Sequence, residues 1–180
     1  GSFADGVGMF AGTASINSGG SVTLSRLAQP QDGIPYASRS LQPDAAPKRI
    51  GFVQQVISGQ TYFYRSQALS IAAKVRCSIS TTIRVALVAW TGAADTAPVD
   101  VVNNWASTTY TAGNFFIANT ETIAVTATAV TAGTFSTIFA WSASAGGVVA
   151  PSGMNNLYMV VWTDLPVAQN VTLDASCIEC

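Results

Sequence analysis

The sequence predicts an all-β fold, an antiparallel two-sheet jelly-roll β-sandwich, and three observations favour it. Apolar and polar residues alternate over short segments, as they do in half-buried strands. Gly, Pro and Asn interrupt this alternation at strand-length intervals. No lysine, arginine or histidine lies between Arg84 and the end of the chain, a stretch built mainly from Thr, Ser, Ala, Val, Gly and Asn. Exposed faces wetted by hydroxyls and amides suit strands better than helices.

The first half of the chain divides into strands and one proline-rich segment. Residues 8–16 and 21–27 flank the turn sequence Asn-Ser-Gly-Gly at residues 17–20, which predicts a hairpin. Residues 28–48 contain four prolines and are expected to form a loop around a short strand. Three further strands are expected at residues 50–57, 68–76 and 83–90.

The second half begins with a long irregular excursion at residues 91–113, and strands follow it. They are expected at residues 121–130, 135–141 and 157–163, with a last strand that places Val171, Leu173, Ala175 and Cys177 on one side. No segment supports a capped helical period for more than a turn or two.

The strand at residues 157–163 reads Leu-Tyr-Met-Val-Val-Trp-Thr and is apolar on both faces. A sandwich strand needs only one face for its own core, so a loop or a neighbouring subunit must cover the other. Low charge elsewhere lowers the desolvation cost of packing subunits together. We therefore expect a homo-oligomer.

Composition sets the broad class of the protein. The chain has 180 residues, 49% of them apolar and 9% charged, which fits a single domain over residues 1–180 and excludes disorder. No apolar run approaches the roughly 20 residues needed to span a bilayer, so we expect no membrane insertion. The net charge is −1 and the bases before Arg84 form only a modest excess, so we expect no nucleic-acid partner.

The absence of histidine argues against ordinary catalysis. Serine–histidine and cysteine–histidine mechanisms are excluded, and only the rarer lysine- or carboxylate-based variants stay open. A glycosidase needs two suitably spaced carboxylates. Asp95 and Asp100 share a loop, and Asp164 and Asp174 bracket a turn, but among nine acids such pairs arise by chance. We therefore expect a protein that is not an enzyme.

No cofactor or metal site is expected either. Cys177 and Cys180 have the spacing of a zinc knuckle, but a tetrahedral site needs four ligands and only Cys77 remains. Small buried thiols in strands are the simpler interpretation. Asp95 and Asp100 could ligate a structural calcium, yet no dense run of aspartates supports one.

Aromatic residues beside amides and acids are the candidates for ligand binding. Flat rings stack on sugar faces, and amide and carboxylate groups hydrogen-bond the hydroxyls. The residues with this chemistry in the excursion are Asp100, Asn103, Asn104, Trp105 and Tyr110. Packing of Trp105 over its own loop is the simpler alternative. Tyr62, Phe63 and Tyr64 form a second cluster beside Arg65, whereas Trp90, Trp141 and Trp162 lie in strands and are expected in the core or at a subunit interface.

Three sets of motifs resemble a known family. The first is Gly-Gln-Thr at residues 59–61 followed by Leu-Ser-Ile-Ala-Ala-Lys at residues 69–74. The second joins residues 88–95 to residues 100–105, and the third joins residues 157–164 to residues 173–179. They resemble the jelly-roll modules, similar to carbohydrate-binding and galactose-binding-like domains, of bacteriophage tail fibres and related phage structural proteins. The family's Ala-Asp-Arg-Trp opening is only half present, since Gly6 and Val7 follow Ala4-Asp5.

The resemblance implies a non-enzymatic phage virion module of a tail fibre, tailspike or head fibre. Its partners would be a host-surface glycan and other virion subunits, its oligomer a homotrimer, and its location the virion, exposed outside the cell. The family's last strand continues beyond the position of Glu179, which implies a fragment of a longer fibre or spike protein. Two alternatives stay open: a purely structural or decoration protein of the virion, and a carbohydrate-binding module of a secreted bacterial glycanase.

Overall fold

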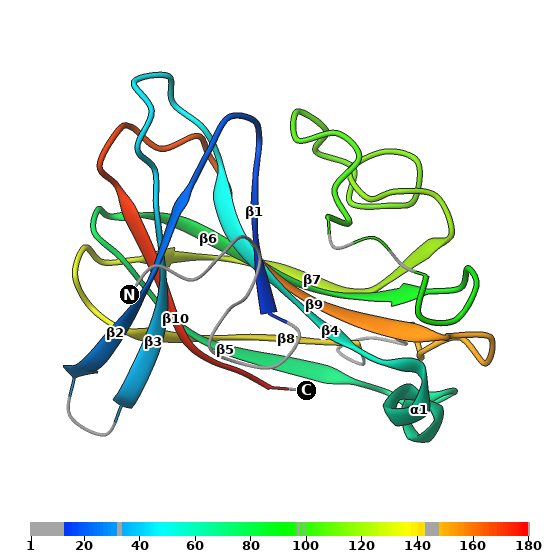
Figure 1. The fold of residues 1–180 in the computed structure, drawn as a ribbon. Helices are drawn as coiled ribbons and strands as arrows, with labels where there is room; N and C mark the ends of the chain where they lie inside the picture. Colours follow the sequence, from blue (N-terminus) through cyan, green and yellow to red (C-terminus); the bar gives the residue numbers. More distant parts are fainter. Residues whose placement is uncertain (1–12, 32–33, 97, 99, 143–147, 180) are drawn as a thin grey trace.

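The computed structural model describes residues 13–31, 34–96, 98, 100–142 and 148–179, and within them the fold is an all-β jelly-roll sandwich (Figure 1). Two five-stranded sheets pack face to face, and every strand pairing is antiparallel. The strands are β1 (Thr13–Asn17), β2 (Thr23–Gln31), β3 (Ile34–Leu41), β4 (Ile50–Val56), β5 (Ser70–Cys77), β6 (Thr81–Trp90), β7 (Thr120–Val130), β8 (Ser136–Trp141), β9 (Asn156–Thr163) and β10 (Thr172–Glu179). The fold class predicted from the sequence is confirmed.

The order of strands defines two sheets with open edges. Sheet A has the order β1-β4-β9-β6-β7, and sheet B has the order β2-β3-β10-β5-β8. Strands β7 and β8 are therefore edge strands on the same side of the sandwich. A short helical turn, α1 (Ser58–Thr61) followed by the 3₁₀ turn η1 (Tyr62–Tyr64), lies between β4 and β5.

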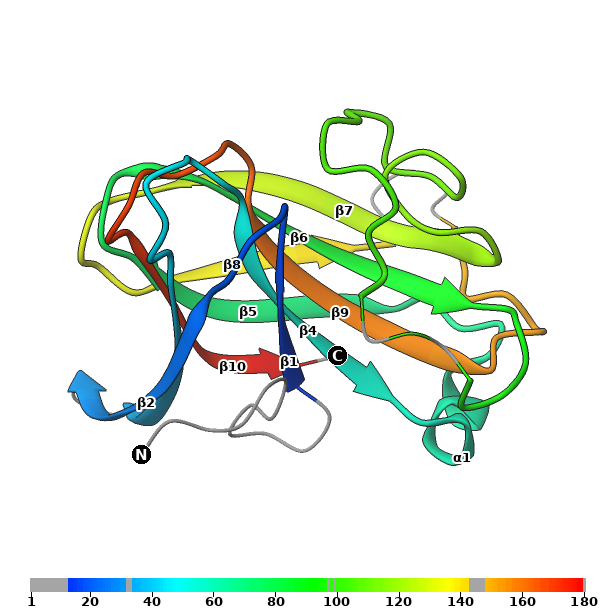
Figure 2. The same ribbon diagram turned by 45° about the horizontal axis from the view of Figure 1, so that its top comes forward.

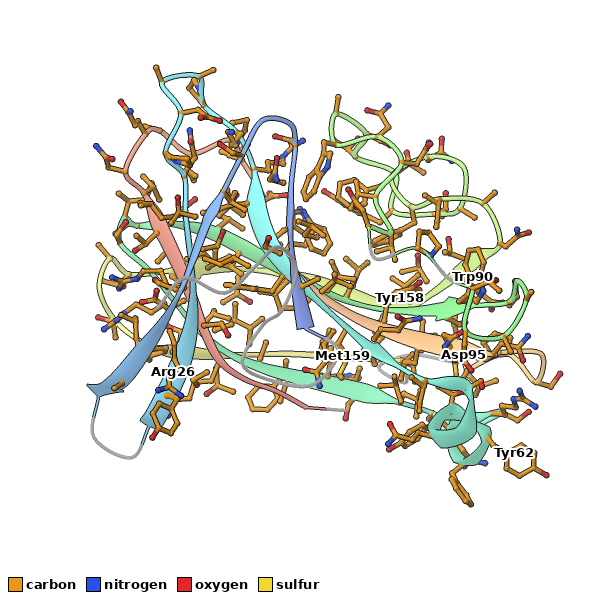
Figure 3. The ribbon with its side chains drawn as sticks, viewed as in Figure 1. Arg26, Tyr62, Trp90, Asp95, Tyr158 and Met159 are labelled. Carbon is orange, nitrogen blue, oxygen red and sulfur yellow. The ribbon has the colours of Figure 1, made fainter. Side chains whose placement is uncertain are left out.

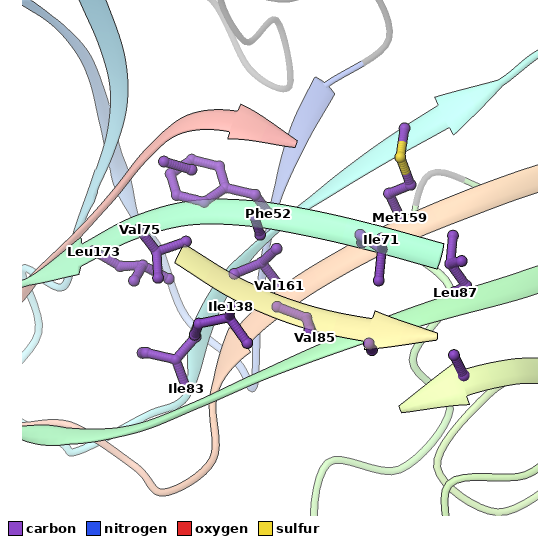
Figure 4. Packing of buried hydrophobic residues seen from close by; sticks show 14 of the residues in the cluster. Phe52, Ile71, Val75, Ile83, Val85, Leu87, Ile138, Met159, Val161 and Leu173 are labelled. Atoms are coloured by element: carbon purple, nitrogen blue, oxygen red, sulfur yellow. The ribbon is translucent and has the colours of Figure 1, made fainter. Parts of the chain in front are cut away.

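The main core lies between the two sheets and follows the alternation in the sequence. In β5 the buried side chains are Ile71, Ala73, Val75 and Cys77, and the residues between them are more exposed. They meet inward-facing residues of sheet A such as Val85, Leu87 and Val161 (Figure 4). A period of two is what a strand with one buried face requires, so this part of the pattern was readable from the sequence.

The chain's own loop covers the outer face of sheet A. Strand β9 is buried at every position, as its apolar sequence predicts. Residues from the connection between β6 and β7, including Val101 and Phe115, pack on Tyr158, Val160 and Trp162 of β9. Figure 2 shows this connection lying over β6, β7 and β9. Of the two coverings that the apolar strand allowed, a loop or a neighbouring subunit, the structure shows the loop.

Two local expectations were wrong. Strands β1 and β2 do not form a hairpin, because β1 pairs with β4 in sheet A and β2 pairs with β3 in sheet B. The turn between them carries the chain from one sheet to the other, and Gly20 adopts a left-handed φ of 74° there. The proline-rich segment contains more strand than expected, since the end of β2 and all of β3 lie in it, and residues 42–48 form a loop. Pro30 is tolerated in β2 because β2 is an edge strand, where a missing N–H breaks no ladder.

Among the described residues, no helix is long and apolar enough to cross a membrane.

Candidate functional site

The polar residues predicted to bind a ligand lie in the connection between β6 and β7, where they stabilise the loop itself. The Asp100 carboxylate accepts a hydrogen bond from the backbone N–H of Val102 at 2.9 Å. The Asn103 amide donates to the carbonyls of Gly113 and Asn114, at 3.2 and 3.1 Å. Asn104 accepts from the N–H of Ala106 at 3.0 Å. Each of these contacts lies within the loop, and the role of these residues in ligand binding stays a prediction.

The two rings predicted in the same loop are partly buried against sheet A. Trp105 packs edge-to-face on Phe115, with the ring centroids 5.7 Å apart. Tyr110 contacts Phe115 and Trp162, and the Arg84 guanidinium lies 4.4 Å from the Tyr110 centroid. Burial raises the pKa of the Tyr110 hydroxyl. The structure therefore brings the predicted residues into one loop, with their rings used in packing.

Most of the described carboxylates are held in ion pairs or hydrogen bonds. Arg84 pairs with Asp164 and lowers its pKa, and Lys48 does the same for Asp44. Asp95 accepts hydrogen bonds from Ser58 and Asn156, which lower its pKa. A general acid needs a raised pKa.

Asp100 differs from these three, since partial burial raises its pKa. Asp100 accepts its hydrogen bond from Val102 in its own loop, whereas Asp95 accepts hydrogen bonds from Ser58 and Asn156 outside that loop. No group of three His, Cys, Asp or Glu residues in the described part of the chain could hold a metal ion. Cys77 is a free thiol buried in the core, and Cys177 and Cys180 have side chains outside the described residues.

Strand β8 presents two aromatic rings to solvent. Ile138 and Ala140 point into the core, so Phe139 and Trp141 lie on the opposite, outer face of sheet B. Each of the two rings is 56% exposed. The position of Trp141 in a strand predicts the core or a subunit interface, and its exposure shows that it does not lie in the core. Trp90 and Trp162 are buried as expected.

The neighbouring strand leaves the faces of these two rings open. Trp141 pairs across the ladder with Ser70 of β5, and Phe139 pairs with Ala72. Both partners are small, so they do not cover the rings. A shallow groove of about 140 Å³, lined by Val125, Thr126, Phe139, Ala140 and Trp141, runs beside them between the edge strands β7 and β8. We call Phe139 and Trp141 the β8 platform.

The sequence contained one signal for the β8 platform. The alternation in residues 135–141 assigns Phe139 and Trp141 to one face and Ile138 and Ala140 to the other. Which face is the core depends on the partners of the strand, and its position at the edge depends on the strand order. Neither can be read from the local pattern.

The second aromatic cluster of the sequence analysis lies on the helical turn. Tyr62 and Phe63 are exposed and meet edge-to-face, at an interplanar angle of 85°. Arg65 stacks 5.5 Å from the Tyr62 centroid and donates to the carbonyl of Met154. Figure 3 shows Tyr62 at the end of the sandwich. The two rings of this cluster are thus perpendicular to each other, and an arginine covers one of them.

Comparisons with known proteins agree on the fold. No protein-family profile and no curated protein matches the sequence. The CBM22-1–GH10 modules of Clostridium thermocellum xylanase 10B, in complex with xylohexaose, align at a TM-score of 0.54 and 14% identity over 91% of this chain and 25% of that one. The present chain therefore spans about a quarter of that xylanase structure.

Two further structures consist of carbohydrate-binding modules. TmCBM61 in complex with β-1,4-galactotriose aligns at a TM-score of 0.50 and 6% identity over 94% of this chain and 87% of the module. A promiscuous carbohydrate-binding module of the β-sandwich superfamily aligns at 0.50 and 7% over 96% of this chain and 58% of that one. At these identities the likeness shows a shared fold, the β-sandwich found in carbohydrate-binding modules.

Proposed function

We propose that this chain is a non-catalytic carbohydrate-binding domain that holds its glycan on the β8 platform. The observation that carries the proposal is the pair of exposed rings, Phe139 and Trp141, on one face of an edge strand with small neighbours. Aromatic rings stack on the apolar faces of pyranoses, and backbone and hydroxyl groups in an adjoining groove can hydrogen-bond the sugar edge. Thr126 and the free edges of β7 and β8 are placed to supply such groups.

The similar structures support a glycan as the ligand class. Two of them were solved with oligosaccharides, xylohexaose and β-1,4-galactotriose, bound to proteins that contain this fold. Most of the described carboxylates are held in ion pairs or hydrogen bonds, which supports a binding role rather than a catalytic one.

The setting that we propose is a phage virion, in which a tail fibre, tailspike or head fibre attaches to a host-surface glycan. Its support is the resemblance of the motifs at residues 59–74, 88–105 and 157–179 and a Ser- and Thr-rich surface with few charges. A module of a secreted bacterial glycanase fits equally well, since the xylanase above joins such a module to an enzyme.

A homotrimer in a fibre stays a prediction that rests on the resemblance. The apolar second face of β9 first suggested subunit packing, and the chain's own loop covers that face. Exposed Tyr62 and Phe63 favour a second candidate function, a structural subunit of the virion that contacts a neighbour at the helical turn.

A glycan array probed with the domain and two phenylalanine variants tests the proposal. We expect wild type and Phe63→Ala to bind the same glycans, and Phe139→Ala to lose about tenfold or more in affinity. This expectation takes for a sugar ring the roughly 1–3 kcal/mol that a nucleic-acid base gains by stacking on one aromatic ring. Phe63 is a matched control because it is also exposed and undergoes the same change. A silent array, together with incorporation of the domain into virus particles, would favour the structural role.

A further inference from the structure

Basic side chains lie on the same face of sheet B as the β8 platform. Along the β5–β8 ladder, Ser70 pairs with Trp141, Ala72 with Phe139 and Lys74 with Thr137. Lys74 is therefore the next outward-facing residue of β5 after Ala72, the partner of Phe139. Diagonal neighbours in an antiparallel ladder are roughly 7–8 Å apart at their Cα atoms, within reach of a lysine side chain.

An ion-pair cluster also lies on this outer face of sheet B. Asp174 of β10 is shared by two arginines, Arg39 of β3 and Arg76 of β5, at 2.7 Å each. No salt bridge involves Lys74 in the described part of the chain. Glu179 pairs with Ala72 on the neighbouring strand, and its side chain lies outside the described residues.

The strands that carry the platform contain almost no negative charge. No charged residue of either sign lies between Glu121 and Asp164, a stretch that includes β8 and nearly all of β7. The groove residues Val125 and Thr126 are neutral as well. An anionic ligand on the platform would therefore meet Lys74 as the nearest charge along the ladder, with no acid on β8 to repel it.

We propose that the β8 platform binds acidic glycans. A sugar ring stacks on Phe139 or Trp141, and its anionic group, a carboxylate, sulfate or phosphate, forms an ion pair with Lys74. A lysine ammonium is a point charge that accepts any of these groups without the fixed geometry that an arginine fork imposes. The inference rests on the proposed function, since it names the class of glycan that the platform takes.

Matched pairs of polymers test the inference in binding titrations with the purified domain. The carboxylate probe is polygalacturonate, and its neutral partner is the methyl ester of the same polymer. The sulfate and phosphate probes are dextran sulfate and phosphorylated dextran, and unmodified dextran is the neutral partner of both. The three acidic arms distinguish carboxylate, sulfate and phosphate as the preferred group. We expect the acidic member of at least one pair to bind more tightly than its neutral partner, and to lose affinity between about 50 mM and 500 mM salt because salt screens exposed charges.

Three variants assign the effect to Lys74. Lys74→Gln should weaken binding of the acidic polymer about fivefold, the upper range for one exposed ion pair, and Lys74→Arg should keep most of the affinity. Arg26→Gln is the matched control, because Arg26 is an exposed cation on β2, the opposite edge of sheet B (Figure 3). It should leave the affinity unchanged.

The outcomes separate this inference from the proposed function. Equal binding of the acidic and neutral members, or a Lys74→Gln variant with unchanged affinity, overturns the acidic preference. The proposed glycan binding still stands in that case if Phe139→Ala weakens it about tenfold or more. Equal losses in Lys74→Gln and Arg26→Gln overturn the role of Lys74 and indicate attraction by overall charge. Absence of binding to every polymer and to the array removes the proposed function, and the inference with it.

Discussion

Replacing Phe115 with alanine should loosen the loop that covers the outer face of sheet A. The Phe115 side chain is 1% exposed and lies at the centre of an aromatic cluster. Its ring stacks on Trp162 with centroids 5.1 Å apart, and it meets Trp105 and Tyr110 edge-to-face at 5.7 and 5.0 Å. Phe115 therefore connects the loop to Trp162 near the end of β9.

The cost of this substitution follows from the burial. Removing a buried phenylalanine ring typically costs about 3–5 kcal/mol, which includes the lost transfer free energy and the cavity left behind. We expect a loss of about 3 kcal/mol or more in the free energy of unfolding, since four aromatic neighbours, Trp105, Tyr110, Phe116 and Trp162, lose their contact at once. Phe63→Ala, at a ring that is 79% exposed, should change stability by less than about 0.5 kcal/mol.

Urea unfolding of both variants measures the difference, and hydrogen exchange reports where it arises. In Phe115→Ala we expect faster exchange for the amides of residues 101–117, together with a red shift of tryptophan emission as water reaches Trp162. A loss below about 1 kcal/mol with unchanged exchange in the loop would refute the conclusion that this loop seals the face of β9.

Three other predictions follow from the charges. Asp174→Asn should lower the free energy of unfolding in urea by about 2 kcal/mol, because it leaves Arg39 and Arg76 facing each other. The loss is smaller than for breaking a fully buried ion pair, since both arginines stay partly exposed. An unchanged unfolding midpoint would contradict this prediction. The pKa values of Asp44, Asp95 and Asp164 are lowered in the folded protein, so their contribution to stability is present above the ordinary aspartate pKa of about 4 and is lost as the pH falls further. Asp164→Asn should therefore flatten the acid limb of a plot of stability against pH. A steeper acid limb would be inconsistent with the lowered pKa of Asp164. Trypsin should leave residues 85–180 of the denatured chain as one fragment in mass spectra, since no lysine or arginine follows Arg84.

The strands of the core could be predicted from the sequence because their environment is regular. The alternation in β5 and the uniformly apolar β9 each correspond to one kind of burial, on one face or on two. The charge-poor second half also agreed with a sheet protein. These are properties of local sequence, which period and composition report directly.

Strand order and the use of aromatic residues could not be predicted, because both depend on contacts far apart in the sequence. Trp105 follows two asparagines in a loop, a combination typical of a sugar-binding site, and its ring packs edge-to-face with Phe115. Trp141 ends an apolar strand and has the composition of a core residue, yet β8 is at the edge of sheet B and turns this ring outward. The face of the sheet that Trp141 occupies follows from the pairing of β8 with β5, which the local sequence does not show.

The affinities of Trp141→Ala and Trp105→Ala for the glycan selected on the array test the central claim most directly. Both variants remove an indole, and only Trp141 belongs to the exposed β8 platform. We predict that Trp141→Ala loses about tenfold or more in affinity, while Trp105→Ala binds like wild type as long as it stays folded. Loss of binding in folded Trp105→Ala with full binding in Trp141→Ala would contradict the account and place the site in the loop between β6 and β7.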